Sequence, residues 1–506
     1  MSPRIRLILF AVVGVAIGMF VGADIANEHY GWAVLVILAC TWLVVKRVSA
    51  AKTDSWLLAV VVIGYVVGNR GFAQLQPSDL VPLLPAEAAL LVVVPMLLFR
   101  MFFRQSLGVR RDWLNYSIII WVLIGAIRLP LDMNRYGVIA LRDFATVYYA
   151  AFFFIAQALG THFSSEKVLT RGLTVAFVGL LPVVVSILIS PDFLVDNFTW
   201  RGVPIIYHKS DLIATSLAAG FFWLWTRWSK SHRRFWLLAA AASLLLIALM
   251  MSPRAGMFAV ALTTAIWVIA GRWRIAAFQL GIISAATVIT LAVMTFSGGE
   301  ITTSVPYSMY EHAISIFDPA GTGNYINNES GDLGGNNQFR LIWWRDVVED
   351  TLAEAPLLGQ GFGADLSTRF LADYDLLGDE TFSARSPHSM LVTVIGRMGF
   401  IGLAAWIMVS GSIAVLVWRL LKSGDPDSMG LASITAVVWT SACFGIVLEG
   451  PMGAVIFWTV LGLANTRPRQ VAGESVVPAE TARPNAESED WPVAKAGAFD
   501  IQSGNP

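Results

Sequence analysis

Charged residues are scarce in this chain. They make up 14% of its 506 residues, against about 25% in ordinary soluble domains, while apolar residues make up 56%. The apolar residues fall in long runs that follow one another from residue 5 to residue 466 with short breaks. A soluble chain of this length would divide into several domains of about 100–200 residues. The sequence therefore predicts one integral-membrane domain over residues 1–466.

Cysteine is almost absent as well. Cys40 and Cys443 each lie inside an apolar run, where a small buried thiol is the usual interpretation. This excludes a disulfide framework, and no Cys/His spacing suits a metal ion. The glycine-rich stretch 357–363 lacks the lysine and hydroxyl of a nucleotide-binding loop and follows a helix rather than a strand. We therefore expect no metal, no cofactor and no nucleic-acid partner.

Fourteen apolar segments are candidates to cross a membrane, for which a helix needs about 20 residues. The first follows Arg4 and Arg6 and has no small-residue cleavage site behind it, so we expect a retained helix rather than a signal peptide. The predicted fold is all-α, a polytopic bundle of about 12–14 transmembrane helices. The candidate segments are 5–23, 30–46, 55–69, 81–99, 113–129, 138–160, 168–190, 208–228, 235–251, 255–271, 274–296, 387–421, 429–448 and 451–466.

Every second short loop is rich in lysine and arginine. Such a bias sets the orientation of a membrane protein. If all fourteen segments span, the basic loops fall on one side, so both termini are expected in the cytoplasm. The longest loop, 297–386, then faces outward. Residues 467–506 are rich in Pro, Ala, Glu and Ser without apolar periodicity, which predicts a disordered cytoplasmic tail.

The outward loop 297–386 is acidic, with fourteen acids, no lysine and four arginines. The predicted outward helix ends also favour arginine, with Lys209 as the single lysine. A guanidinium fork matches phosphate oxygens bidentately, whereas an ammonium is a hydrated point charge. The set therefore suits a pyrophosphate at headgroup depth; the alternative is that these arginines snorkel and pair with acids or lipid phosphates. The arginines at the helix ends are Arg70, Arg128, Arg135, Arg142, Arg201 and Arg254, and those of the loop are Arg340, Arg345, Arg369 and Arg385.

Two of these arginines occupy unusual positions. Arg254 follows Ser252 and Pro253 between two apolar runs, which predicts the apex of a tight outer hairpin. Arg201 precedes a glycine in the loop that leads through Lys209 into the helix expected over 208–228. Polar groups crowded at a membrane surface cost free energy unless they bind a ligand or pair with other polar groups.

The long loop contains a helix-like stretch over 338–355, whose apolar residues recur at spacings of three to four. Asn336 or Asn337 would cap it, which places Arg340 in the first turn, where a cation opposes the helix dipole. A bound anion would reverse that effect. The alternative is a surface ion pair between Arg340 and one of the many acids.

His388 lies at the end of the loop. Ser386 suits an N-cap and Pro387 the first helical position, so we expect His388 in the first turn of the segment 387–421. A helix N-terminus disfavours imidazolium, which predicts a neutral imidazole able to accept a proton. The alternative is a structural or capping histidine.

The interruption at 396–399 predicts a half-helix followed by the true span, with Arg397 buried or snorkelling.

Taken in order along residues 200–420, these motifs resemble the O-antigen ligase and polymerase superfamily. The chain departs from the family at Ser389, where asparagine is frequent, and at residues 208–211, where the family is commonly Asn-rich. The matching pieces are Arg201 with Gly202, the residues 252–255, Arg340 four residues before Trp344, the stretch 356–363, and Pro387 to Ser389 leading into 399–402.

The resemblance implies a helical fold of the GT-C type in the bacterial inner membrane, with the loop 297–386 in the periplasm. It implies metal-independent, inverting transfer of a glycan from undecaprenyl pyrophosphate to a glycan or lipid A-core hydroxyl. His388, Arg340 and Arg201 would be catalytic, and Arg254, Arg142 and Lys209 would bind the pyrophosphate. The alternative is a polymerase that joins lipid-linked repeat units of O-antigen or exopolysaccharide, and the resemblance slightly favours the ligase. Two further classes stay open: a transporter or flippase, which would also have many spans, and a non-catalytic assembly protein.

Overall fold

The computed structural model describes most of the chain between residues 52 and 471. The first two predicted spans, Cys40, residues 252–253 and the predicted tail beyond residue 471 lie outside the described residues. The described residues are 52–76, 84–104, 110–250, 254–298, 300, 302, 304–318, 320–323, 325, 328–373 and 385–471.

The described chain is almost entirely helical, which confirms the all-α class. Its two strands, β1 (Thr199–Trp200) and β2 (Val203–Pro204), form one short antiparallel hairpin. The helices before the hairpin are α3 (Lys52–Val67), α4 (Asn69–Ala73), α5 (Pro85–Arg104), α6 (Trp113–Tyr136), α7 (Val138–Asp143), α8 (Ala145–Tyr148), α9 (Ala151–Gly160), α10 (Phe163–Ile189) and α11 (Pro191–Asn197). Those after it are α12 (Ser210–Ser231), α13 (Arg234–Leu249), α14 (Arg254–Ile269), α15 (Arg274–Ser297), α16 (Val305–Ser315), α17 (Asn328–Glu354), α18 (Thr368–Asp373), α19 (Met390–Ser423), α20 (Pro426–Cys443) and α21 (Pro451–Val471).

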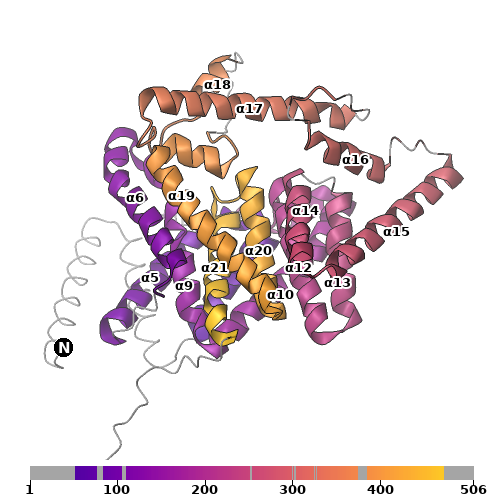
Figure 1. The fold of residues 1–506 in the computed structure, drawn as a ribbon, viewed down its shortest axis with the longest axis horizontal. Coiled ribbons are helices and arrows are strands. Elements are labelled where there is room, and N and C mark those ends of the chain that lie inside the picture. The colour runs from indigo at the N-terminus through magenta and orange to yellow at the C-terminus, as the bar shows by residue number, and fades with distance from the viewer. Residues whose placement is uncertain are drawn as a thin grey trace, which may run out of the picture.

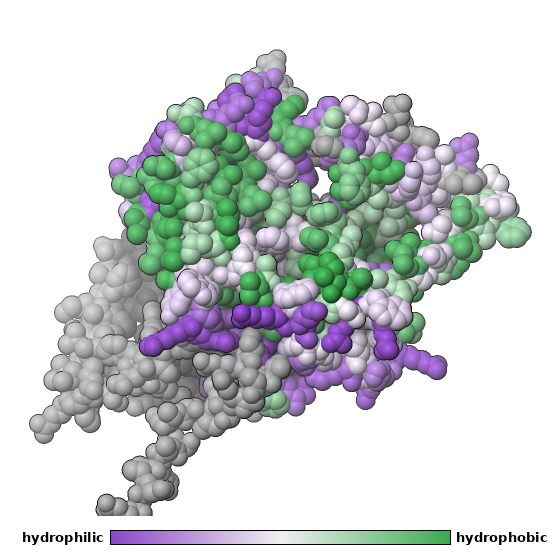
Figure 2. Space-filling model, viewed as in Figure 1, coloured by the Kyte–Doolittle hydropathy of each residue, from purple (hydrophilic) through white to green (hydrophobic). Residues whose placement is uncertain are grey.

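Five helical stretches in the described residues are long and apolar enough to cross a membrane. They are α6, the run Val138–Gly160 formed by α7, α8 and α9, α10, α15 and α19, and shorter apolar helices occur within α3, α5, α13 and α14. Figure 2 shows a broad apolar band on one face, with hydrophilic belts on both sides of it. This is the pattern of a helical membrane protein. The number of spans and their orientation stay predictions.

Helix α12 is at the centre of the bundle. All of its residues from 212 to 226 are buried, and it packs against α10, α13, α14 and α20. A helix that is buried all round belongs inside a bundle rather than on its lipid-facing surface. The packing of α12 therefore fixes the position of its first residues at one end of the bundle.

Helix α17 lies across one end of the bundle, with α16 and α18 beside it (Figure 1). We name this the α17 end. Trp343 and Val347 of α17 pack in a small hydrophobic cluster with Leu366, Phe370 and Val392. The indole nitrogen of Trp343 also donates to the Leu366 carbonyl at 2.7 Å. These contacts fix α17 over the beginning of α19.

Helix α19 is broken at Gly399, whose φ of 61° and ψ of −158° are not helical. This confirms the predicted interruption at 396–399. The glycine-rich stretch packs into the break, since Gln360 donates to the Gly396 carbonyl at 2.7 Å and a Cβ on Gly359 would lie 2.5 Å from the Gly399 nitrogen. The glycines thus allow this stretch to approach the α19 backbone closely.

Helix α6 holds the same stretch from the other side. Arg128 donates to the Gly359 carbonyl at 2.8 Å, and Asp132 accepts from the Phe362 amide at 2.7 Å. Arg128 and Asp132 also pair with each other at 2.9 Å within α6. The stretch that follows α17 is therefore held between α6 and the break in α19.

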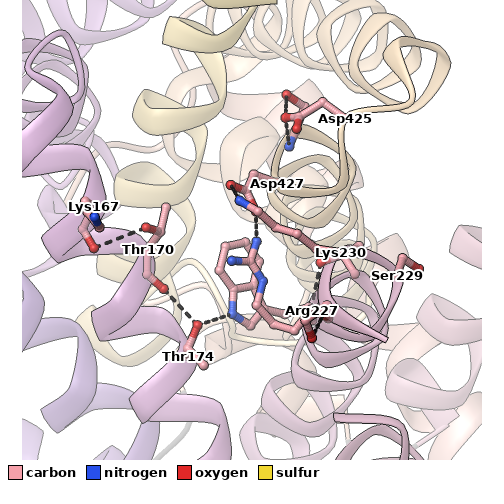
Figure 3. A network of polar contacts seen from close by, with 12 residues as sticks. Lys167, Thr170, Thr174, Arg227, Ser229, Lys230, Asp425 and Asp427 are labelled. Carbon is pink, nitrogen blue, oxygen red and sulfur yellow. Dashed lines mark hydrogen bonds and ion pairs between the residues drawn. The ribbon is translucent and has the colours of Figure 1, made fainter. Parts of the chain in front are cut away.

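The opposite end of the bundle has its own polar network. Arg227 and Lys230 of α12 both pair with Asp427 near the start of α20, as Figure 3 shows. Arg467 near the end of α21 pairs with Glu166 of α10. These ion pairs join four helices at the ends that lie away from α17.

Candidate functional site

The predicted site residues come from segments far apart in the sequence, and several of them meet at the α17 end. Lys209 is the N-cap of α12, Arg254 begins α14, Arg340 belongs to α17, and His388 precedes α19. Lys209 and Arg340 lie close enough to His388 for their charges to act on the imidazole. Arg340 and Arg254 are likewise within electrostatic range of each other. We name Lys209, Arg254 and Arg340 the cation cluster.

His388 is not in the first turn of a helix, so that prediction is wrong. Helix α19 begins at Met390 with Ser389 as N-cap, and His388 has a left-handed φ of 54°. The indole of Trp344 donates to the Pro387 carbonyl at 2.6 Å, which keeps that carbonyl out of the helix. A left-handed conformation costs a non-glycine residue about 1–2 kcal/mol. Tertiary contacts, rather than local helix formation, therefore hold His388 in place.

Burial is the main influence on the charge of His388. Burial, followed by the charges of Lys209 and Arg340, lowers the pKa of its imidazole to about 4. The ring lies 5.7 Å from that of buried Trp343, measured between centroids. The imidazole is therefore neutral at pH 7, as predicted, although the cause is burial beside two cations and not a helix dipole.

Arg340 lies in the middle of α17, because this helix begins at Asn328, ten residues before the start we expected. The argument from the helix dipole is therefore wrong. The Arg340 guanidinium instead reaches down to the bundle and donates to the Phe444 carbonyl at 2.8 Å. Burial lowers the pKa of Arg340 and the nearby Asp211 carboxylate raises it, yet an arginine stays charged at neutral pH.

Two hydrogen bonds join Arg254 to side chains of two other helices. Its Nη1 donates to Asn337 of α17 at 2.6 Å and to Ser315 of α16 at 3.3 Å. The Asn337 amide in turn donates to the carbonyls of Ser315 and Asp318, both at 2.8 Å. Asn337, expected to cap a helix, thus positions Arg254.

Arg201 and Arg142 lie on other segments. Arg201 and Gly202 form the turn of the β-hairpin, with φ of 53° and 78°, and the hairpin leads into Lys209. Two successive positive φ values favour Asn-Gly in such a turn, so an arginine there is not explained by the turn itself. Arg142 is exposed on α7, and no described contact joins it to the cation cluster. The assignment of both residues to the site stays a prediction.

Glu449 contacts the segment that contains His388, and the sequence reasoning missed it. The hydroxyls of Ser386 and Thr393 both donate to its carboxylate, the latter at 2.8 Å. Burial raises the pKa of Glu449, while these two hydrogen bonds and the charge of Arg397 oppose that shift. Glu449 therefore links Ser386, two residues before His388, to Thr393 in the first turn of α19. The available signal was an acid directly before the apolar run 451–466.

Arg397 is buried in protein, which is one of the two predicted alternatives. Only 4% of it is exposed, and it pairs with Asp143 of α7. Asp143 also accepts from the Gly363 amide at 3.0 Å. This pair connects the first half of α19 to the glycine-rich stretch, so it is a structural contact.

No group of three potential metal ligands occurs in the part of the chain that the structure describes. The loop does contain one Asp-x-Asp pattern, Asp373 and Asp375, of which only the exposed Asp373 at the end of α18 is described. Metal-independent transfer therefore stays a prediction. Comparison with known protein families and with curated protein sequences finds no match in either.

Proposed function

We propose that this protein is a membrane glycosyltransferase that moves a glycan from undecaprenyl pyrophosphate to an acceptor hydroxyl, as O-antigen ligases do. The observation that supports this most is that Lys209 and Arg340 lie near a neutral His388, with Arg254 near Arg340, at one end of an apolar bundle. In this proposal the bundle is of the GT-C type and lies in the bacterial inner membrane. The α17 end then faces the periplasm.

The cation cluster would bind the pyrophosphate. Its guanidinium groups suit the phosphate oxygens, and they stabilise the negative charge that grows on the leaving group as the sugar–phosphate bond breaks. The pyrophosphate departs with the electron pair of that bond. Arg201 and Arg142 are assigned to the same ligand as a prediction.

His388 would accept the proton of the acceptor hydroxyl. The hydroxyl oxygen attacks the anomeric carbon from the face opposite the pyrophosphate, which inverts the configuration, and the proton then passes to water. A pKa of about 4 makes His388 a weak base while the cluster is empty of anions. A bound pyrophosphate offsets the charges of Lys209 and Arg340, so it raises that pKa and prepares the base.

The test uses purified protein in lipid vesicles with an undecaprenyl-pyrophosphate-linked repeat unit. A ligase transfers nothing until a lipid A-core or other distinct acceptor is added, whereas a polymerase makes longer lipid-linked chains from the donor alone. Transfer that persists in EDTA would support metal independence. Failure to transfer in every arm would overturn the proposal in favour of a transporter or an assembly protein.

A further inference from the structure

His388 lies between two residues that are joined to each other through a third. Its φ of 54° is left-handed, and such a conformation persists where surrounding contacts hold it in place. Glu449, just before α21, contacts Ser386 two residues before His388 and Thr393 five residues after it. Glu449 therefore ties together the chain on both sides of the strained residue.

The side chains of Glu449, Ser386 and Thr393 form a closed ring of contacts. The Ser386 hydroxyl lies within hydrogen-bonding distance of one carboxyl oxygen, and the Thr393 hydroxyl lies 2.8 Å from the other. The two hydroxyls also lie 3.3 Å from each other, and either one can be the donor. A hydrogen bond needs one proton, so the three contacts need three protons.

An ionised Glu449 leaves this ring one proton short. Each hydroxyl supplies one proton, and a carboxylate only accepts. Both protons then point at the carboxylate, and none lies between the two hydroxyl oxygens. A protonated carboxyl group supplies the third proton: it donates to one hydroxyl, which donates to the other, which donates back to the second carboxyl oxygen. Each contact then contains one proton, and the bonds of such a chain strengthen one another.

The surroundings of Glu449 agree with a bound proton. Burial raises the pKa of Glu449, whereas the hydroxyl contacts and the charge of Arg397 lower it and the charge of Asp143 raises it. These charges come from α19 and α7, the described neighbours that act on the carboxyl group. Since Arg397 pairs with Asp143, much of its charge is already matched.

We infer that Glu449 is a positioning residue that keeps a proton at neutral pH, closes the ring with Ser386 and Thr393, and so holds His388 in its left-handed conformation. The inference rests on the proposed function for the role of His388 as the base. When Glu449 loses its proton at higher pH, the ring loses one hydrogen bond and its hold on His388 weakens. Transfer then slows at alkaline pH because of Glu449, and at acidic pH because of His388.

The main test compares Glu449→Gln with Glu449→Ala. Glutamine has nearly the same shape as glutamate and carries one acceptor oxygen and a donor nitrogen, so it closes the ring as a protonated carboxyl group does. At neutral pH the glutamine variant should keep kcat near that of the wild type, whereas the alanine variant should lose about 10–100-fold through misplacement of His388. The fall in kcat at alkaline pH should be absent from the glutamine variant.

Two further variants complete the series. Thr393→Val keeps a branched side chain but removes one hydroxyl of the ring, so it should lower kcat even if Glu449→Ala fails to fold. Glu354→Ala is the control, because Glu354 is an exposed acid at the end of α17. It should change neither kcat nor the alkaline fall.

Infrared difference spectroscopy of the full protein in lipid vesicles tests the proton directly. A protonated carboxyl group has a C=O stretching band that a carboxylate lacks, and Glu449→Gln should remove one such band at neutral pH. No lost band, equal kcat in the glutamine and alanine variants, or wild-type kcat in Thr393→Val would overturn the inference. A wild-type protein that transfers nothing would overturn the proposed function and the role of Glu449 in it, while the band would still decide whether Glu449 holds the proton.

Discussion

The two ends of the bundle hold polar clusters of opposite kinds. At the end away from α17, Arg227 and Lys230 pair with Asp427, and Arg467 pairs with Glu166. At the α17 end, the described hydrogen bonds of Arg340 and Arg254 go to a carbonyl, a hydroxyl and a side-chain amide. Cations that pair with a carboxylate of another helix, as Arg227 and Arg467 do, hold the helices together. The described hydrogen bonds of Arg340 and Arg254 to neutral groups suit them to bind an anion as well, and the Asp211 carboxylate lies near Arg340.

Backbone conformation separates the two ends in the same way. Asp425 caps α20 with a 2.8 Å hydrogen bond to the Ser428 amide, which is the usual local rule for a helix start. At the α17 end, His388 is left-handed and α19 has no side-chain cap. Strained residues are common at functional sites, where surrounding contacts hold them in place. We therefore expect substitutions at the α17 end to change activity and those at the other end to change stability.

The largest effect is expected from His388→Asn. Asparagine tolerates the left-handed conformation but cannot act as a base, so kcat should fall by about 10²–10⁴-fold while the melting temperature stays near that of the wild type. Transfer assays and thermal unfolding in detergent measure the two quantities. Wild-type transfer by this variant would remove His388 from the mechanism.

Arg340→Gln should have the next largest effect, a loss of about 10²–10³-fold in kcat, because one group that stabilises the leaving pyrophosphate is gone. Arg345→Gln is the control on the same helix, since Arg345 is exposed and pairs with Asp346 and Glu349. Equal losses in both variants would mean that the general charge of α17 matters, and not the position of Arg340.

Asp427→Ala should destabilise the protein by about 3–5 kcal/mol, because it leaves the partly buried Arg227 guanidinium without its carboxylate, whereas Lys230, the other partner, is exposed. Activity per folded molecule should stay near that of the wild type. Replacing Arg227 by methionine in the same chain should recover part of the stability. A folded Asp427→Ala protein with no transfer activity would contradict the division between the two ends.

The smallest effect is a shift in the pH profile. The neutral form of His388 is the active one, so activity in the free enzyme falls as pH drops through its pKa of about 4, well below the ordinary 6.5. At pH 5.5 about 97% of His388 is then neutral, against about 9% at the ordinary pKa. The acidic limb of kcat/KM measures this pKa.

Lys209→Met should move that limb to higher pH, because removing a nearby cation makes imidazolium less unfavourable and raises the pKa of His388. Lys230→Met at the opposite end is the control and should not move it. A limb at the same pH in the Lys209 variant would show that Lys209 does not act on His388.

Hydropathy alone locates the five described stretches that are long and apolar enough to cross a membrane, because such a helix is a local property of about 20 residues. The break in α19 was also predictable, from the two glycines at 396 and 399. The position of His388 was not, since it depends on the contact between Trp344 and Pro387, 43 residues apart. Glu449 was missed for the same reason, because its partners Ser386 and Thr393 come 63 and 56 residues earlier.

The contacts between α6 and the glycine-rich stretch can form only after the ribosome has made both segments, so they form late in synthesis. The carbonyl that Arg128 binds belongs to Gly359, 231 residues later in the chain, and the amide that Asp132 binds belongs to Phe362, 230 residues later. At about 5–20 residues per second, synthesis of that length takes about 10–50 s. During this interval the pair between Arg128 and Asp132 gives each charge a partner within its own helix. The same two residues thus pair with each other while the helix is being made and hold the glycine-rich stretch once the chain is complete.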